Sequence, residues 1–462
     1  MTQTSPPGPT EAGGDQPSLK RVMGPGLLLL FIIGDILGTG IYALTGEVAG
    51  EVGGAAWLPF TIAFVVALIT ACSYLELVTK YPEAAGAALY VHKAFGKHVL
   101  TFLVCFAVMC SGITSASAAS RAFAANLATG LGLDVGNGVI LMIAVGFMLL
   151  VLAVNLRGVG ESVKANVVLT AIELSGLLLV IVLSLTFILG GQADFSRVVA
   201  FETSADKSVF LAISAATSLA FFAMVGFEDS VNMAEETKDP SRIFPRMLFT
   251  GLGITGLIYV LVSICAVAVV PVGRLADSET PLVTVVQTAT PGVPIADLLP
   301  FISMFAVANS ALINMLMASR LLYGMGKRGV LPPFLSKVHP SRRTPEAAIL
   351  FTTAIAVALI TVISLIPDSP VVALLGGTTS LLLLAVFAIV NVAVLVLRKD
   401  ETGVAHFNAG RVLPVAGTIT CLYLVLPWSS GRPVGQYQIA GVLLAMGLIL
   451  WGLTSLSGKR KA

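Results

Sequence analysis

The sequence predicts an all-α membrane protein whose chain crosses a bilayer twelve times. Only 11% of its 462 residues are charged and 56% are hydrophobic, whereas a soluble domain carries about 25% charged residues. The apolar residues gather in long runs, and a run of roughly 18 or more residues is enough to span the hydrocarbon core. Four clear examples are 97–120, 138–155, 247–271 and 372–397.

The candidate spans follow a polar N-terminal segment. Residues 1–22 include many Pro, Gly, Ser and Thr, which predicts a disordered cytoplasmic tail. The expected limits of the spans are 26–50, 55–79, 97–127, 137–156, 162–190, 208–236, 247–271, 294–326, 346–366, 370–397, 411–428 and 435–457. The eleventh has the weakest signal, because it is short and contains Pro414.

Lysine and arginine set the expected orientation, because cytoplasmic loops carry an excess of both. With the N-terminus inside, 22 of the 27 basic residues fall on the cytoplasmic side. The others, on the outer side, are Arg121, Arg197, Lys207, Arg274 and Arg432. An even number of spans returns the C-terminus to the same side. We therefore expect a multi-pass protein of the cytoplasmic membrane with both termini in the cytoplasm.

Composition and motifs argue against several other classes of protein. A net charge of +2 without a basic and aromatic cluster gives no support for nucleic-acid binding. The cysteines lie in apolar spans without CxxC spacing and the four histidines are scattered, so we expect neither disulfides nor a metal site. The sequence has no phosphate-binding loop, no HExxH and no Gly-x-Ser-x-Gly motif. We therefore expect no cofactor and no enzyme activity.

Two spans contain residues that disfavour a continuous helix. The first carries Gly38 and Gly40 in its middle, and glycine is a poor helix former. The sixth carries Gly226 and Glu228, where a lipid-facing helix would have neither a glycine nor a carboxylate. One explanation is that these glycines only let helices pack closely. The other is that both helices are broken within the bilayer.

Broken helices at corresponding positions of two halves are typical of a transporter's binding site. A break inside a bilayer is tolerated only where it lines a cavity or is buried in protein. The N-terminal end of a half-helix offers N–H groups to an anion and the C-terminal end offers carbonyls to a cation. An α-amino acid has one group of each kind. Spans one and six each start a unit of five, and the odd number makes the second unit inverted.

Three carboxyl groups are expected at bilayer depth, where charges are costly and usually face a cavity: Asp35, Glu173 and Glu228. Glu173 lies about as deep in its span as the first break does. It shares one helical face with Asn166 and Thr170, and that face should point into the protein. The alternative for each carboxyl is a purely structural hydrogen bond. Weaker polar candidates at similar depth are Ser111, Thr114, Ser115 and Asn309.

Several stretches also share a pattern with a known family. They are residues 38–42, 81–90, 155–159 and 221–246, with a weaker match at 318–332. These stretches resemble those of the amino acid–polyamine–organocation family of permeases, and the stretch in span six is the most specific. The resemblance implies a leucine-transporter-type fold, with two inverted repeats of five helices and two extra helices. The corresponding units are 23–190, 208–397 and 411–462.

The resemblance further implies an amino acid or a related amine as substrate, bound at the two breaks. The matching positions are Gly38, Thr39, Gly40 and Ile41 in span one, and Phe222, Met224 and Gly226 in span six. Phe222 matches an aromatic residue that acts as a lid in this family. Some relatives have a lysine in span five in place of a coupling sodium ion. Here the matching position is Glu173, so coupling through lysine is not carried over.

The expected function is secondary active transport of amino acids across the bilayer by alternating access, coupled to protons. Glu173 is the first candidate for the coupling carboxyl, with Asp35 and Glu228 as alternatives, because a buried carboxyl can load and release a proton. An amino acid exchanger is the main alternative. A passive channel is a further one, although a channel does not need paired broken helices.

Overall fold

The computed structural model describes residues 21, 23–83, 86–157, 162–203, 207–327, 329–340, 342, 344–367, 369–400, 403 and 405–459. In these residues the regular structure is helical, and β-pairing is limited to two isolated bridges. The prediction of an all-α protein is therefore confirmed. The predicted N-terminal tail lies almost entirely outside the described residues.

Eleven helical segments of the described chain are long and apolar enough to cross a membrane. Their α-helices are α1 (Pro25–Ile36) with α2 (Thr39–Val52), α3 (Trp57–Lys80), α5 (His98–Gly130), α6 (Asn137–Arg157), α7 (Ser162–Leu189), α8 (Val209–Ala220), α9 (Pro240–Val269), α12 (Leu299–Lys327), α13 (Glu346–Ser364), α14 (Val371–Leu397) and α17 (Val434–Lys459). The eleventh predicted span corresponds to α15 (Val412–Val425), which has only 14 residues. The total of twelve spans thus stays a prediction.

Two predicted boundaries are wrong by several residues. The seventh span was expected from 247, but α9 already begins at Pro240, since proline is well suited to the first position of a helix. The eighth was expected from 294, but α12 begins at Leu299 after a 3-10 turn at Pro294–Leu298. In the first case the helix begins in a polar stretch that hydropathy does not mark as a span. In the second, the apolar stretch before the helix forms a 3-10 turn, which hydropathy does not distinguish from an α-helix.

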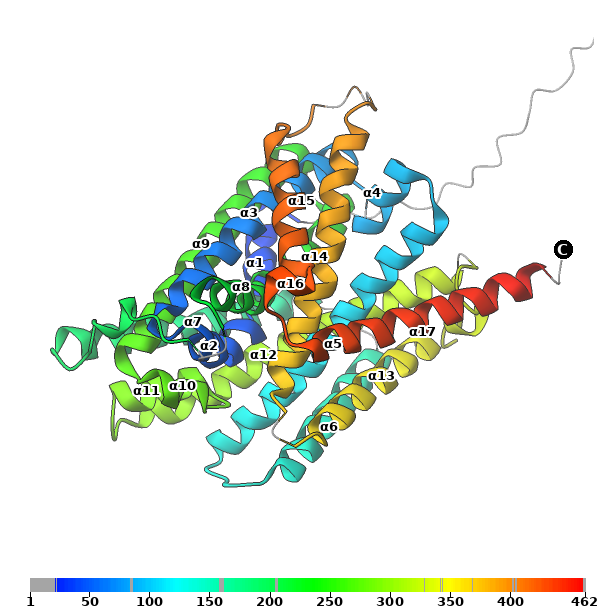
Figure 1. Ribbon diagram of the computed structural model, residues 1–462. Coiled ribbons are helices and arrows are strands. Elements are labelled where there is room, and N and C mark those ends of the chain that lie inside the picture. Colours follow the sequence, from blue (N-terminus) through cyan, green and yellow to red (C-terminus); the bar gives the residue numbers. More distant parts are fainter. Residues whose placement is uncertain are drawn as a thin grey trace, which may run out of the picture.

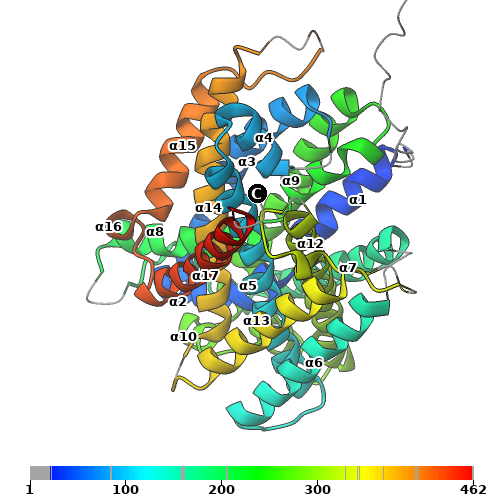
Figure 2. The same ribbon diagram turned by 90° about the vertical axis from the view of Figure 1, so that its right-hand side faces the viewer.

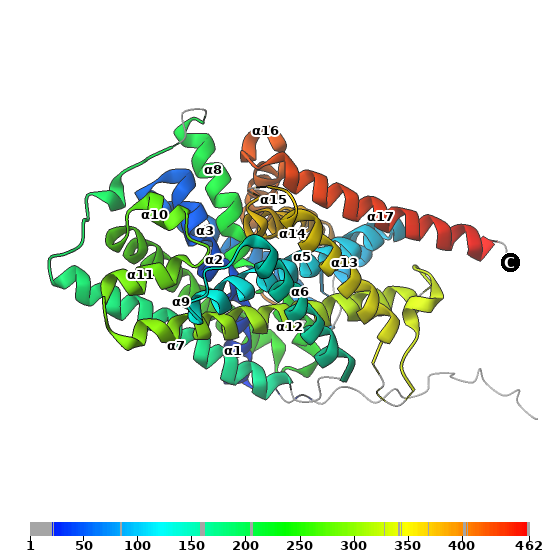
Figure 3. The same ribbon diagram turned by 90° about the horizontal axis from the view of Figure 1, so that it is seen from below.

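The helices form one bundle in which α5 and α12 cross the centre (Figures 1 and 2). These two helices pack on each other along much of their length, and α14 packs on α5. On another side of the bundle α9 packs on α1 and α3, and α2 packs on α8. The last helix, α17, projects away from the others (Figure 3). Only 17% of its most apolar stretch is buried against other helices, so most of its surface is left for lipid.

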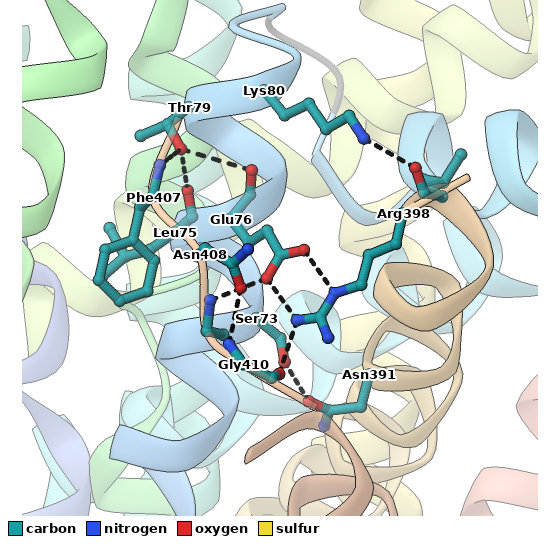
Figure 4. Close-up of polar contacts among 12 residues, drawn as sticks. Ser73, Leu75, Glu76, Thr79, Lys80, Asn391, Arg398, Phe407, Asn408 and Gly410 are labelled. Carbon is teal, nitrogen blue, oxygen red and sulfur yellow. Dashed lines mark hydrogen bonds and ion pairs between the residues drawn. The ribbon is translucent and has the colours of Figure 1, made fainter. Parts of the chain in front are cut away.

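A buried ion pair ties the segment after α14 to α3 (Figure 4). The guanidinium of Arg398 donates to both carboxylate oxygens of Glu76, at 2.8 and 2.7 Å, and Glu76 is only 3% exposed. The N–H of Ala409 donates to the same carboxylate at 2.8 Å, and the N–H of Phe407 donates to the Thr79 hydroxyl at 3.0 Å. A bidentate arginine pair with further hydrogen bonds is the geometry in which a buried ion pair is well compensated.

The same end of the bundle is held by two further contacts. The Lys80 ammonium donates to the carbonyl of Leu397 at 2.8 Å, and the Tyr81 hydroxyl donates to Asp400 at 2.5 Å. Burial, together with this hydrogen bond, raises the pKa of Tyr81, which keeps the phenol protonated as a donor. These contacts make the end of α3, the end of α14 and the segment before α15 one connected unit.

Candidate functional site

The first break divides the first membrane span into α1 and α2. The α1 helix ends at Ile36 and α2 begins at Thr39, within the single apolar segment Pro25–Val52. Between them, Gly38 has φ 157°, which side chains rarely adopt. A Cβ on Gly38 would lie 2.3 Å from Oγ of Ser310 on α12. Glycine is therefore needed here by the backbone and by the neighbouring helix.

The two helix ends at this break offer different backbone groups. No side chain caps the N-terminus of α2, and the first N–H groups of a helix have no partner within it. On the other side of the break, the Ile36 carbonyl accepts a hydrogen bond from the Tyr259 hydroxyl of α9 at 2.7 Å. The N-terminus of α2 is thus the part of this break suited to an anion such as a carboxylate.

The second break spreads over a longer stretch of the sixth span. The α8 helix ends at Ala220, a 3-10 turn covers Phe221–Met224, and a second 3-10 segment covers Asp229–Glu236. Between these turns Gly226 has φ 125°, and its N–H donates to Oε2 of Glu228 at 2.9 Å. The Glu228 side chain therefore satisfies a backbone group that the break exposes.

The two breaks contact each other through their backbones. A Cβ on Gly226 would lie 2.5 Å from the carbonyl oxygen of Asp35, and a Cβ on Gly40 would lie 2.4 Å from Cα of Ala223. Both distances are far below an ordinary van der Waals contact. The interrupted spans that the sequence singled out therefore meet at one place, and glycine makes this approach possible.

A central cavity of about 30 Å³ lies at this meeting point. It is lined by Asp35, Ile36, Gly38, Thr39, Gly40, Ser115, Phe222, Val225, Gly226, Asp229, Ser310 and Asn314. Of the predicted binding residues, Ile41 and Met224 are absent from this lining and lie fully buried in the apolar core. The remaining predicted positions of both breaks surround the cavity, so the structure brings most of the predicted set together.

Sequence reasoning missed several residues that line this cavity. Ser310 and Asn314 lie one helical turn apart on α12, whereas the predicted candidate on that span, Asn309, lies outside the lining. Asp229 also lines the cavity, directly after the predicted Glu228. The four-residue spacing of two polar side chains in an apolar span was a signal that could have found the α12 pair.

A second small cavity, of about 20 Å³, adjoins the first. It shares Val225, Asp229 and Asn314 with the central cavity and adds Glu228 and Met317. Its residues on α5 and α12 lie nearer the end of the bundle where α5 begins and α12 ends. The two cavities thus lie one after the other, from the breaks toward that end.

Glu173 is fully buried on α7 and faces the first break. Its Oε1 lies 3.7 Å from the position that a Cβ on Gly38 would take. Neither of its carboxyl oxygens has a hydrogen-bond partner among the described residues. The backbone is held in place, because the Tyr42 hydroxyl of α2 donates to the Glu173 carbonyl at 2.8 Å. One turn earlier Thr170 packs against Gly34 of α1, while the side chain of Asn166 lies outside the described residues.

The surroundings of the breaks are acidic. Asp35 and Asp229 line the central cavity, Glu228 lines the second, and no lysine or arginine among the described residues lines either one. Oδ2 of Asp35 is buried without a hydrogen-bond partner in the described structure. Burying an ionised carboxylate without a counter-ion is costly, so such groups bind protons or cations. Chemically, the site can hold a carboxylate at the N-terminus of α2 and a cationic group among its carboxyls.

Phe222 packs against α14, and Arg432, from the segment before α17, binds both α14 and the end of α8. A Cβ on Gly376 of α14 would lie 3.0 Å from the Phe222 ring. The adjacent Gly377 carbonyl accepts a hydrogen bond from Nη1 of Arg432 at 2.8 Å, and Nη2 of this arginine is 3.3 Å from the Ser218 carbonyl, near the end of α8. A cation is favourable at the C-terminal end of a helix. Arg432 therefore connects the segment before α17 to the second break.

Known membrane transporters are similar to this chain in sequence. The family model described as amino acid permease matches residues 27–453. The branched-chain amino acid permease of Bacillus subtilis (strain 168) is 26% identical over 465 residues, which cover 96% of this chain and 95% of that protein. The methylthioribose transporter of the same organism is 27% identical over 438 residues, with 88% of each chain covered.

A solved structure shows the fold. The manganese transporter of Eremococcus coleocola, in a mutant form, has a TM-score of 0.58 and 15% sequence identity, and the likeness covers 95% of both chains. This similarity confirms the leucine-transporter-type fold. Because the family model extends over most of the chain, this protein belongs to the amino acid permease family of the amino acid–polyamine–organocation group and is a membrane transporter.

Proposed function

We propose that this protein is a secondary active transporter that moves amino acids across the cytoplasmic membrane by alternating access, coupled to protons. The observation that carries the proposal is the contact between two broken spans around a cavity with complementary groups. The N–H groups at the start of α2 suit the α-carboxylate of a substrate. Asp35 and Asp229, which line the same cavity, suit its ammonium group.

Alternating access is supported by the size of the cavity. A cavity of about 30 Å³ has room for about two water molecules, which is less than any amino acid needs. The lining helices must therefore separate before a substrate can enter. Phe222 lines the cavity from the second break and is 5% exposed, which is the position expected for a lid.

Proton coupling is supported by the carboxyl groups that lack counter-ions. Glu173 is the leading carrier, because both of its oxygens are unpartnered and it faces the Gly38 break. Asp35 is the next, with Oδ2 also unpartnered, while Glu228 is already bound to the N–H of Gly226. We propose that proton binding to one of these groups accompanies each substrate.

Orientation and domain division belong to the same proposal. The distribution of basic residues supports cytoplasmic termini. The breaks at the start of α2 and after α8 support the division into repeats 23–190 and 208–397, followed by 411–462. Under this orientation the second small cavity lies on the cytoplasmic side of the breaks.

The proposal is tested by counterflow in proteoliposomes that contain the full chain. Vesicles preloaded with an unlabelled amino acid should take up the same labelled amino acid, with saturation, and a channel would not show this. The panel should include L-leucine, L-alanine, L-lysine and methylthioribose, because the relatives' names include both kinds of substrate. An imposed pH gradient should then drive accumulation. Counterflow without this accumulation would favour the exchanger.

A further inference from the structure

A larger cavity lies farther along α5, beyond the breaks. Its volume is about 560 Å³, which is within the range of typical ligand sites, whereas the central cavity is far smaller. The polar residues that line it include Arg121, Thr129, Asp134, Asn137, Glu279 and Ser369. We refer to it as the Arg121 cavity. Under the proposed orientation it lies at the outer end of the bundle.

The Arg121 cavity is close to the central site along the same helix. Ser115 lines the central cavity, and Arg121 follows six residues later on α5, which is about 9 Å of helix. Arg121 also lies two turns beyond Thr114 on the same helical face, since seven residues make about two turns. A molecule in the Arg121 cavity would therefore be a short step from the breaks.

Arg121 is a buried arginine held by two neighbours. Its side chain is 8% exposed, Nη1 donates to Oδ1 of Asn137 at 2.6 Å, and Nη2 donates to Oε1 of Glu279 at 2.6 Å. The amide of Asn137 is itself oriented, because its Nδ2 donates to the Ser364 carbonyl at 2.7 Å. Three elements therefore fix the guanidinium in one position: α5, the start of α6, and the segment before α11 (Pro281–Ala289).

This arrangement leaves hydrogen-bond donors on a positive group and acceptors on negative groups available in the cavity. A guanidinium has five N–H donors, and the hydrogen bonds found for Arg121 among the described residues use one donor each from Nη1 and Nη2. Oε2 of Glu279 and the carboxylate of Asp134 remain as acceptors on the same cavity.

We propose that the Arg121 cavity is a second, peripheral binding site for a zwitterionic amino acid. The α-carboxylate binds the remaining donors of Arg121, and the ammonium group binds Oε2 of Glu279 or Asp134. Ala125, Ala128 and Ile140 form an apolar wall for the side chain. This inference rests on the proposed function, because it concerns the same class of substrate.

The competing explanation is that Arg121 and Glu279 form only a structural ion pair. A pair alone does not require a cavity of this size beside it, nor a second carboxylate, that of Asp134, in its walls. The Glu279 side chain is 57% exposed, and exposed pairs contribute little to stability. The two explanations differ in the number of molecules that the protein binds.

The test is equilibrium binding to the purified full chain in detergent, with radiolabelled L-leucine, L-alanine and L-lysine used in turn. The wild-type chain should bind two molecules of an amino acid that shows counterflow. Arg121→Gln, which removes the charge, should bind one. Ala128→Leu, which places a larger side chain on the apolar wall of the cavity and keeps the ion pair, should also bind one. Arg274→Gln, which changes an exposed arginine on α10 (Val272–Ala276), should still bind two.

The outcomes separate this inference from the proposed function. Counterflow with a single bound molecule that Arg121→Gln and Ala128→Leu both retain would overturn the second site and leave the transporter intact. Chloride, acetate and unlabelled L-alanine should then be added in turn as competitors of the second labelled molecule. If chloride or acetate displaces it and L-alanine does not, the cavity is a simple anion site and the inference is overturned. Absence of both binding and counterflow for every amino acid would overturn both proposals. If Arg121→Gln does not fold, Ala128→Leu and Asp134→Asn carry the test.

Discussion

The two broken spans satisfy their exposed backbone groups in different ways. The break in the first span is short and depends on other helices, since Tyr259 of α9 binds the Ile36 carbonyl and Ser310 of α12 lies against Gly38. The break in the sixth span is longer, and one of its own side chains binds an exposed backbone group: Glu228 accepts a hydrogen bond from the N–H of Gly226, two residues away. The first break therefore keeps uncapped helix N–H groups beside the cavity, whereas the second supplies side chains such as Phe222.

This difference suggests a division of roles between the breaks. A helix N-terminus without a capping side chain is suited to an anionic ligand, so the first break is expected to determine binding of the carboxylate. A stretch of 3-10 turns has weaker hydrogen-bond geometry than an α-helix, so the second break is expected to move. The following predictions test this comparison, from the largest expected effect to the smallest.

Gly40→Leu should have the largest effect, because its side chain would enter the backbone of Ala223 at the contact between the breaks. We expect substrate affinity to fall by about 100-fold, which corresponds to about 2.7 kcal/mol and lies within the range for overpacking. Equilibrium binding to monodisperse protein measures this. Gly253→Leu is the matched control, since no atom lies within 4 Å of a Cβ at that exposed position. Unchanged binding by Gly40→Leu would remove the first break from the site.

Glu173→Gln should separate coupling from binding. Glutamine keeps the shape of the side chain but cannot bind and release a proton, so accumulation driven by a pH gradient should fall to the level seen without a gradient. Counterflow should persist, because both breaks stay intact. Proteoliposome uptake with and without the gradient measures both, and Glu202→Gln, at an exposed position, is the control. Gradient-driven accumulation that survives in Glu173→Gln would exclude Glu173 as the carrier.

Phe222→Ala tests whether the second break moves a lid. Loss of a ring that lines the cavity should change substrate affinity by about tenfold, or let substrate leak through, because a buried aromatic contact is worth about 1 kcal/mol or more. Uptake and efflux of label in the same vesicles measure the two effects. Phe305→Ala changes a ring that is 52% exposed on α12 and should alter neither. If both variants behave like the wild type, Phe222 only packs against Gly376.

Tyr259→Phe and Glu228→Gln should have the smallest effects, and together they sharpen the comparison of the two breaks. Without its hydroxyl the Ile36 carbonyl loses its partner from α9, which should cost about 1 kcal/mol and lower the melting temperature of the purified protein. Glu228→Gln should cost less, because a glutamine oxygen can still accept from the N–H of Gly226. Tyr323→Phe on α12 serves as the control. The opposite order would show that the second break, not the first, depends on its side-chain bond.

The lining of the central cavity shows how far sequence reasoning reached into the site. Gly38, Gly40 and Gly226 were found because a glycine in an apolar span is a local signal, and each lines the cavity. Ile41 and Met224 were expected in the site, but they are fully buried in the apolar core and do not line the cavity. A break resets the phase of the helix that follows it, so the facing side of the next residues cannot be read from periodicity.

The same limit explains the residues that were missed. Asn309 was chosen on span eight, while Ser310 and Asn314 line the cavity, because neighbouring positions on a helix point about 100° apart. Arg121 entered the sequence reasoning only as a basic residue of the outer side. Its bond to Glu279 joins residues 158 positions apart, and no local pattern records such a contact.

By itself, the sequence determined the class of the protein, the position of nearly every membrane span and the two places where helices break. These are local properties, set by hydropathy over about 20 residues and by the weak helix propensity of glycine. The tertiary structure alone decided that the breaks touch, that Glu173 faces Gly38, and that the Arg121 cavity forms at the other end of α5. Those relations depend on how helices far apart in the chain pack together, and close packing is set by the shapes of both partners.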